Sequence, residues 1–373
     1  MEIILITGIF MSFFIAFLLL TKKGKVITDK ILAAWTIIIG IHLLGFYLNR
    51  MGYWQLYPHL IGTTAPIPLL HGPLIYLYTL YSLRKDNKLR KIDYLHFTPA
   101  VIAYFYMLNF FFFYSAEEKL LVDLGKIPDY AVFKFVLLIA ILISGLVYAI
   151  LSYRLTWIHG GRIRNNFSND EGINLKWLRN CIVGIALVFI SATIVFSLRE
   201  GLGIPFSFDA DYIFYLIIIF LIFYIGYFGI KQENIFTNNT QIVNNNPESV
   251  KYKNSGLKDE AAIELHKKLL HTMETDKPFL DPKLSLSCLS ENLNVTPNQL
   301  SQVINQYEKV NFNDFVNSYR VEEFIRKAAK NKNYSILALA LDSGFNSKSS
   351  FNNVFKKHKG ITPSAYLSQS THN

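Results

Sequence analysis

The sequence predicts an all-α protein in two parts: a seven-helix transmembrane bundle, followed by a soluble domain in which one pair of short helices occurs twice. Two observations carry this prediction. Apolar residues make up 51% of the chain and gather before Lys231, in runs of about 20 residues, the length that crosses a bilayer. After Lys231 the chain becomes polar, and the apolar residues that remain follow helical spacing.

Seven apolar runs are candidates for membrane-spanning helices. They are Ile3–Leu20, Ile27–Leu48, Pro66–Leu83, Tyr94–Tyr114, Tyr130–Leu151, Trp177–Leu198 and Tyr212–Ile230. The third has the least regular sequence, because Pro66, Pro68 and Pro73 crowd its start. The first run is followed by lysines and not by a cleavage site, so we interpret it as a span rather than a signal peptide.

Basic residues alternate between the loops that join these runs. The first, third and fifth loops are rich in Lys and Arg, whereas the other loops hold few basic groups or carry acidic groups beside them. By the positive-inside rule, the odd-numbered loops are cytoplasmic. The N-terminus is then outside, and the C-terminal domain lies in the cytoplasm, where DNA is. The predicted location is the inner (cytoplasmic) membrane, with several passes.

A polar stretch and an amphipathic helix follow the last apolar run. Residues 1–230 form the predicted membrane domain, and residues 231–256, rich in Asn and Thr, are predicted as a linker. Residues 257–276 form a predicted helix with one apolar stripe, made of Ala261, Leu265, Leu269 and Met273. Two interpretations stay open for this helix. It transmits a signal or pairs with a second copy, or it packs on the domain that follows.

One helical arrangement occurs twice between Ser285 and Tyr366. Each copy begins at a serine cap and continues with apolar residues at helical spacing. Each then turns at a residue type that tolerates a left-handed backbone, Asn294 in the first copy and Gly344 in the second, before another short helix. This is the pattern of a helix-turn-helix. The two units are expected at about residues 285–306 and 335–358, joined by a helix at 313–330.

The end of this stretch, GFNSKSSFNNVFKKHKGITPSAY, closely resembles the signature of AraC/XylS-type transcription regulators. The resemblance covers residues 277–369 and does not extend to the apolar part of the chain. It implies a DNA-binding domain in which two helix-turn-helix units, joined by one long helix, read successive major grooves on one face of DNA.

Polar residues in the second helix of each unit are the candidate DNA contacts. Amide side chains suit adenine edges, and lysines suit phosphates. The first unit offers only amides and therefore adds no phosphate attraction. The candidates are Asn298, Gln299, Gln302 and Asn305 in the first unit, and Ser347, Lys348, Asn352, Asn353, Lys356 and Lys357 in the second.

A few polar groups lie inside the predicted spans. His42, His71 and Asn109 are candidates for a sensing site, because polar groups in a membrane are costly and tend to be functional. Lys134 lies near a span end, where its ammonium can reach the membrane surface. Among the thiols, Cys181 and Cys288 lack metal-ligand spacing and are predicted to be inert and buried.

The sequence contains no motif of an enzyme: no Gly-rich phosphate loop, no HExxH and no GxSxG. The predicted function is a membrane-anchored, sequence-specific DNA-binding transcription regulator whose membrane domain is a sensor. Two alternatives stay open: a transporter with a regulatory DNA-binding tail, and a constitutive DNA-binding module with a passive anchor. The partners to consider are double-stranded DNA, the lipid bilayer, RNA polymerase, a second copy of the chain and an unknown small ligand. No cofactor or metal is expected.

Overall fold

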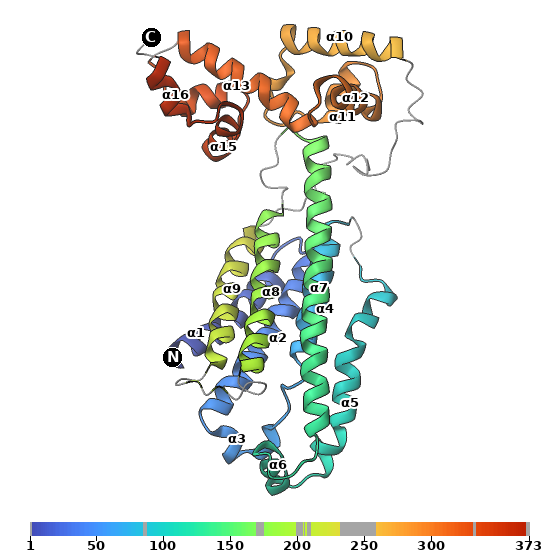
Figure 1. Cartoon of the computed structure of the whole chain (residues 1–373), viewed down its shortest axis with the longest axis vertical. Coiled ribbons are helices and arrows are strands. Elements are labelled where there is room, and N and C mark those ends of the chain that lie inside the picture. The colour runs from blue at the N-terminus through green and yellow to red at the C-terminus, as the bar shows by residue number, and fades with distance from the viewer. Residues whose placement is uncertain are drawn as a thin grey trace. The chain divides into compact units, whose positions relative to one another are not determined.

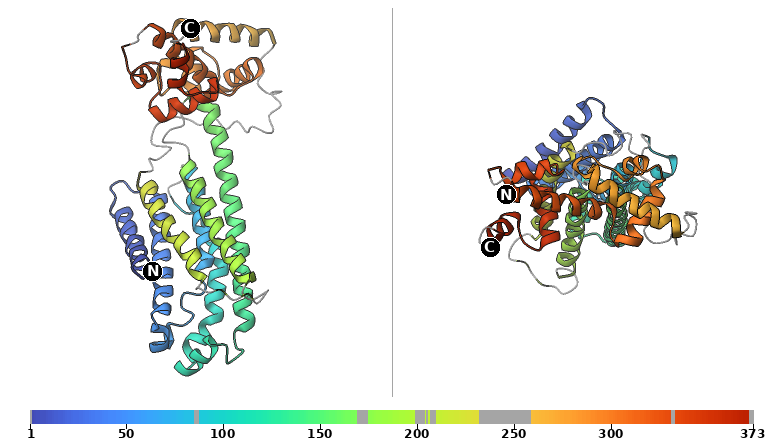
Figure 2. Two further views of the ribbon diagram at one scale, coloured as in Figure 1. Left: turned by 60° about the vertical axis from the view of Figure 1, so that its left-hand side comes forward. Right: turned by 90° about the horizontal axis from the view of Figure 1, so that it is seen from above.

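The computed structural model divides into two compact units, which are all-helical over the residues that it describes (Figure 1; Figure 2). It describes residues 2–84, 88–168, 175–198, 204, 206, 210–231, 259–330 and 333–370. The first unit contains Met1–Trp157 and Leu175–Asn234, and the second contains Ile158–Asn174 and Ile235–Asn373. The segment 158–174, which the sequence places in the membrane domain, therefore groups with the C-terminal unit.

The first unit is a bundle of apolar helices. Its members are α1 (Glu2–Thr21), α2 (Ile27–Arg50), α3 (Tyr53–Leu56), α4 (Pro68–Ser82), α5 (Thr98–Phe113), α6 (Ala116–Asp123), the first part of α7 (Ala131–Asn166), α8 (Lys176–Phe196) and α9 (Asp211–Lys231). Helix α2 contacts α1, α4 and α9, and α9 also contacts α1 and α8. Short 3₁₀ helices at Pro58–Leu60 and Lys91–Phe97 precede α4 and α5.

Six helices in the described part of the chain are long and apolar enough to cross a membrane. They are Glu2–Thr21, Ile27–Arg50, Lys91–Phe113, Ala131–Asn166, Lys176–Val195 and Asp211–Gly229. The third predicted span differs, because it forms only the 15-residue helix α4. Turns occupy the residues just before Pro68, since proline cannot donate the backbone hydrogen bonds of a helix interior. Of the seven predicted membrane spans, six thus form helices long enough to cross a membrane.

The outer surface of this bundle is rich in large apolar side chains. On α5, Phe105, Phe112 and Phe113 are 74%, 76% and 81% exposed. An apolar surface of this kind is unfavourable in water and suits the hydrocarbon of a bilayer, in which helices satisfy their own backbone hydrogen bonds. The exposed faces therefore agree with membrane insertion.

The second unit is built along one helix that carries two apolar cores. Its helices are α10 (Asp259–Thr275), α11 (Leu286–Asn292), α12 (Pro297–Val303), α13 (Phe312–Lys330), α14 (Ile336–Asp342), α15 (Lys348–Lys359) and α16 (Pro363–Ser370). The first half of α13 packs with α10, α11 and α12 around Phe315. The second half packs with α14 and α15 around Phe324 and Phe351. Helix α13 therefore joins two helix-turn-helix units, each with its own core.

Local signals set the ends of these short helices. The Ser285 hydroxyl accepts a hydrogen bond from the Cys288 N–H at 3.2 Å, and Ser335 caps α14 in the same way. The turns have left-handed backbones, with φ of 57° at Asn294 and 93° at Gly344. After α12, a π-helical turn at Ile304–Glu308 leads toward α13.

Helix α10 packs on the core of the first helix-turn-helix unit. Its buried residues are Ala262, Leu265, Leu269 and Met273. Ala261, which the sequence places on this stripe, is exposed, because the buried face is shifted by one residue at that end. Of the two interpretations of this helix, packing is the one that its contacts support. Most of the predicted linker, residues 232–256, and the first two residues of the predicted helix, 257 and 258, lie outside the described residues.

Gly344 and Gly360 form a matched pair for testing the second helix-turn-helix unit, because both have positive φ. A Cβ on Gly344 would lie 2.2 Å from the Phe279 carbonyl oxygen, whereas a Cβ on Gly360 would meet nothing within 4 Å. We expect Gly344→Ala to destabilise the second helix-turn-helix unit by more than about 2 kcal/mol, and Gly360→Ala by only about 1 kcal/mol. Hydrogen exchange of the full-length protein in detergent measures both effects. Equal losses would show that the Gly344 turn is not closely packed.

Candidate nucleic-acid interface and membrane sites

Helix α15 presents a polar face that is suited to DNA. Phe351 and Phe355 are fully buried and orient the opposite face outward. The exposed residues of that face include Lys348, Asn352, Asn353, Lys356 and Lys357. Ser347, another predicted contact, has a local role, since its hydroxyl accepts a hydrogen bond from the Ser350 N–H at 3.1 Å and caps the helix.

The basic groups of α15 differ in their partners. The Lys357 ammonium donates to Asp314 at 2.5 Å, and Lys359 donates to Glu322 at 2.6 Å, both across to α13. Lys356 is exposed and has no ion pair within the described part of the chain. Partial burial lowers the pKa of His358 below its usual value, so this side chain adds no charge at neutral pH. Lys356 is therefore the clearest candidate for a phosphate contact.

Helix α12 offers fewer available amides than the sequence predicts. Asn298 is exposed. The Gln299 side chain instead completes the helix cap, because its Oε1 accepts hydrogen bonds from the Thr296 N–H and hydroxyl, both at 3.0 Å. The Asn305 amide donates to the Ser301 hydroxyl at 3.3 Å.

Two predictions of exposure are wrong in this unit. Gln302 was expected on the outer face but is only 8% exposed. Helices α10 and α11 both pack on α12, so four consecutive residues, Leu300 to Val303, are buried. Cys288, expected to be buried, is exposed on α11, whereas Cys181 is buried as predicted. The two helices that pack on the short α12 thus decide which of its polar residues can reach DNA.

A buried arginine that the sequence analysis does not single out lies in the middle of α13. Arg320 is 1% exposed, and its Nε and Nη2 donate to the carbonyls of Phe279 and Asp281, each at 2.8 Å. Burial lowers the pKa of the Arg320 guanidinium to about 10, so it stays charged at neutral pH. One signal was available in the sequence, because Arg320 falls at helical spacing with Asn317 and Phe324 on the inner face of the connecting helix.

In the first unit, the structure brings two of the three predicted sensing residues together. The His42 Nδ1 and the His71 Nε2 lie 3.2 Å apart, and the Trp35 Nε1–H donates to the His71 Nδ1 at 3.3 Å. Because Trp35 can only donate, a neutral His71 carries its proton on Nε2 and donates it to His42. Asn109 is exposed on α5 and takes no part in this cluster.

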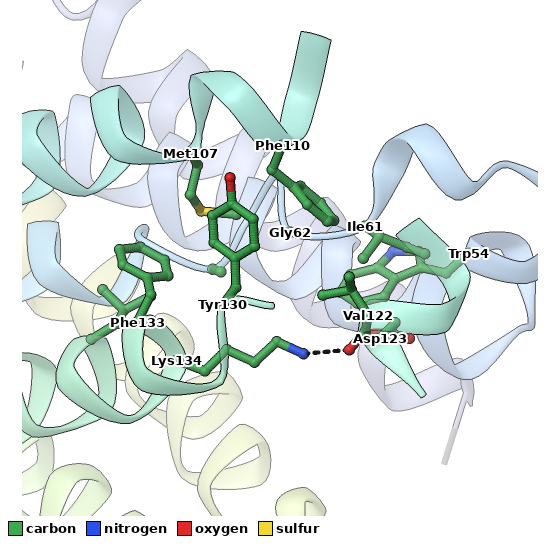
Figure 3. A pocket seen from close by; sticks show the side chains of 12 residues that line it. Trp54, Ile61, Gly62, Met107, Phe110, Val122, Asp123, Tyr130, Phe133 and Lys134 are labelled. Atoms are coloured by element: carbon green, nitrogen blue, oxygen red, sulfur yellow. Dashed lines mark hydrogen bonds between the residues drawn. The ribbon is translucent and has the colours of Figure 1, made fainter. Parts of the chain in front are cut away.

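A cavity of about 300 Å³ lies elsewhere in the same unit, among α3, α5, α6, α7 and the loop before α4. Its walls are mostly apolar and aromatic, and Lys134 and Asp123 supply charge (Figure 3). Its lining residues are Trp54, Ile61, Gly62, Ala65, Met107, Phe110, Val122, Asp123, Tyr130, Phe133, Lys134 and Leu137. Tyr130 has a left-handed backbone with φ of 63°, which is unusual for a residue with a side chain.

The charged groups that line this cavity are of both signs, Lys134 and Asp123. The Lys134 ammonium donates to the Val122 carbonyl at 2.9 Å (Figure 3). Lys119, behind the Phe110 ring, is 1% exposed and contacts His59 Nδ1 and the Phe111 carbonyl, both at 2.9 Å. Partial burial raises the pKa of Asp123 above its usual value, which makes its negative charge less favourable. Because the walls are mostly apolar and the Lys134 ammonium uses one of its donors on Val122, the cavity suits an apolar molecule that carries one hydrogen-bond acceptor.

The comparison with known families concerns the C-terminal unit. Residues 289–369, from within α11 to within α16, match the model of a helix-turn-helix domain family. No curated protein and no solved structure matches the chain. Together with the two helix pairs along α13, the match shows that the C-terminal unit contains an AraC-type helix-turn-helix domain, a DNA-binding domain of transcription regulators.

Proposed function

We propose that this protein is a membrane-anchored, sequence-specific transcription regulator whose membrane unit senses a small molecule. The observation that carries the proposal is helix α7. It is 36 residues long, its first part is apolar enough to cross a membrane, and its last residues belong to the unit that contains the helix-turn-helix domain. One continuous helix thus contributes to both the membrane unit and the DNA-binding unit.

The DNA-binding surface is formed by the exposed residues of α15, with Asn298 of α12 as a base contact. We expect Lys356→Ala to weaken binding to all duplexes and to lower the salt dependence of the affinity by about one counterion. Lys357→Ala is the matched control, and its effect is smaller because Lys357 is paired with Asp314. Asn298→Ala leaves the salt dependence unchanged and relaxes base preference, at a cost of about 1–3 kcal/mol.

These constants are measured by titrating the full-length protein, in detergent, against duplexes that the parent selects from a random pool. Unchanged affinity and salt dependence for Lys356→Ala on every duplex would show that α15 does not contact DNA. A parent protein that selects no sequence from the pool would contradict sequence-specific regulation itself.

The membrane unit is proposed to cross the bilayer seven times, with the N-terminus outside and the DNA-binding unit in the cytoplasm, as the alternation of basic loops favours. Helix α4 is the crossing to test, because it is the shortest. In a chain with Cys181→Ser and Cys288→Ser, we expect Tyr57→Cys to react with a membrane-impermeant maleimide in intact cells and Lys88→Cys to react only after lysis. Protection of both cysteines would place the two ends of α4 on one side and reduce the count to six.

The cavity of Figure 3 is the proposed sensing site, and its ligand class is an apolar carboxylate. Its volume lies at the lower end of the range for small-molecule sites. The aromatic walls bind the apolar body, and the Lys134 ammonium, which already uses one hydrogen bond on Val122, has two hydrogens left for a carboxylate. The pair of His42 and His71 is less suited to this role, since both ring nitrogens of His71 are already engaged, one with His42 and the other with Trp35.

Binding at this site can be followed through Trp54, one of the lining residues. We expect 11-bromoundecanoate to quench its fluorescence saturably and the methyl ester of the same acid to bind far more weakly. Lys134→Met should lower the affinity for the acid by about tenfold, the effect of losing a charge-assisted hydrogen bond, and Ala65→Phe should fill the cavity and abolish binding. Trp54→Phe is the control for the signal. Equal quenching by acid and ester would indicate partition into the lipid-facing surface and contradict the site.

Two functional experiments distinguish a sensor from a passive anchor and from a transporter. Replacement of the membrane helices by an unrelated anchor leaves transcription unchanged if the membrane unit is passive, and removes the response to a ligand if it is a sensor. Accumulation of a labelled carboxylate inside vesicles that contain the protein would instead identify a transporter with a DNA-binding tail.

A further inference from the structure

A short segment after α7 is built into the C-terminal unit. Phe167 forms an isolated antiparallel bridge with Ser285, the residue that caps α11. The Ser168 N–H and hydroxyl both donate to the Leu284 carbonyl, at 3.2 and 2.6 Å. These contacts join residues more than a hundred positions apart, and the segment lies outside the region 289–369 that matches the helix-turn-helix family.

The other side of this segment meets α13. The Ser168 carbonyl accepts hydrogen bonds from the amides of Asn313 and Asn317, at 3.0 and 3.3 Å, and from Arg320 Nη1 at 3.2 Å. The Ser168 hydroxyl accepts another from Arg320 Nη2 at 3.0 Å. The Asn313 amide also donates to the Phe167 carbonyl at 3.1 Å. Ser168, itself only 1% exposed, therefore lies between the start of α11 and the connecting helix.

The segment completes the hydrogen bonding of the buried arginine. The Arg320 guanidinium has five N–H donors. Within the described contacts these donors are directed to Phe279, Asp281, Asn317 and, twice, Ser168. A buried charge is tolerated only when its donors are satisfied. Loss of the segment would leave two of them without these partners.

The arginine also lies against the turn of the second helix-turn-helix unit. A Cβ on Gly344 would be 3.0 Å from Arg320 Nε and 2.2 Å from the Phe279 carbonyl oxygen. The same side chain thus contacts the segment that leads into the first unit, the connecting helix, and the turn that precedes α15. Its environment fixes how the two helix-turn-helix units are held relative to each other.

We infer that Phe167 and Ser168 are a structural part of the DNA-binding unit, and that their docking on Arg320 holds its two helix-turn-helix units in the arrangement that binds DNA. The inference rests on the proposed function, and it names how that function is regulated: displacement of the segment at the end of α7 loosens the two units and weakens DNA binding.

Docking itself is tested by a disulfide in the full-length protein with Cys181→Ser and Cys288→Ser. Residues that face each other in an antiparallel bridge have Cα atoms about 4.5–5.5 Å apart, which is within disulfide range. We expect Phe167→Cys and Ser285→Cys to cross-link on mild oxidation, so that the C-terminal unit stays attached after cleavage at a protease site inserted in residues 232–256. Phe167→Cys with a cysteine in place of Ser364, an exposed residue of α16, is the control and should not cross-link. Failure of the first pair to form would overturn the docking.

Its effect on DNA is tested by removing the contacts that side chains supply. We expect the double variant Ser168→Ala, Asn313→Ala to bind a duplex selected by the parent about tenfold more weakly. The control Ser364→Ala, Asn292→Ala changes the same residue types at exposed positions and should bind like the parent. Oxidised Phe167→Cys, Ser285→Cys protein should bind at least as tightly as its reduced form.

Unchanged or tighter binding by the double variant, or weaker binding after oxidation, would overturn the inference, since the segment would then be neutral or inhibitory. If the double variant unfolds the second helix-turn-helix unit, the inference is decided by the DNA affinities of the oxidised and reduced Phe167→Cys, Ser285→Cys protein alone. Failure of the parent itself to bind DNA concerns the proposed function and leaves the cross-link result intact.

Discussion

The C-terminal unit depends on the buried charge of Arg320. Arg320 lies where the two apolar cores of α13 meet, between Val316 of the first core and Val321 of the second. A guanidinium at this position would destabilise the unit if it were unpaired, so backbone carbonyls and polar side chains from several parts of the chain converge on it. The positions of these partners are fixed, because the planar guanidinium donates its hydrogen bonds only along set directions. An apolar residue there could fill space but could not impose that alignment.

This constraint explains why the family match and the compact unit have different extents. The match begins at residue 289, inside α11. The folded unit also includes α10, which supplies four buried residues to the first core, and the end of α7 with Ser168. A DNA-binding domain with an added helix and an added segment has surfaces that other parts of the chain can influence. In this protein the segment directly follows α7, whose first part is apolar enough to cross a membrane.

The first unit combines close packing inside with exposed apolar side chains on its outer surface. Gly145 illustrates the inside, since a Cβ there would lie 2.4 Å from the Phe189 ring, so this aromatic ring of α8 packs on α7 at a small residue. Several of its polar side chains contact one another, among them His42 with His71 and Lys119 with His59. At the cavity, the Lys134 ammonium lies among walls that are mostly apolar and aromatic.

The sequence by itself determined the features that depend only on residues close together in the chain. Of the seven apolar runs, six correspond to helices of spanning length, and serine caps with Asn294 and Gly344 located the two helix-turn-helix units to within a few residues. These features are local, because caps, turns and helical periodicity act over a few residues. Only the tertiary structure decided which side chains are covered and by what. Gln302 is buried because two helices pack on α12, and the short α4 does not reach the length of a regular span. Ser168 and Arg320 find each other across about 150 positions of sequence, a separation over which no periodicity or local motif carries information.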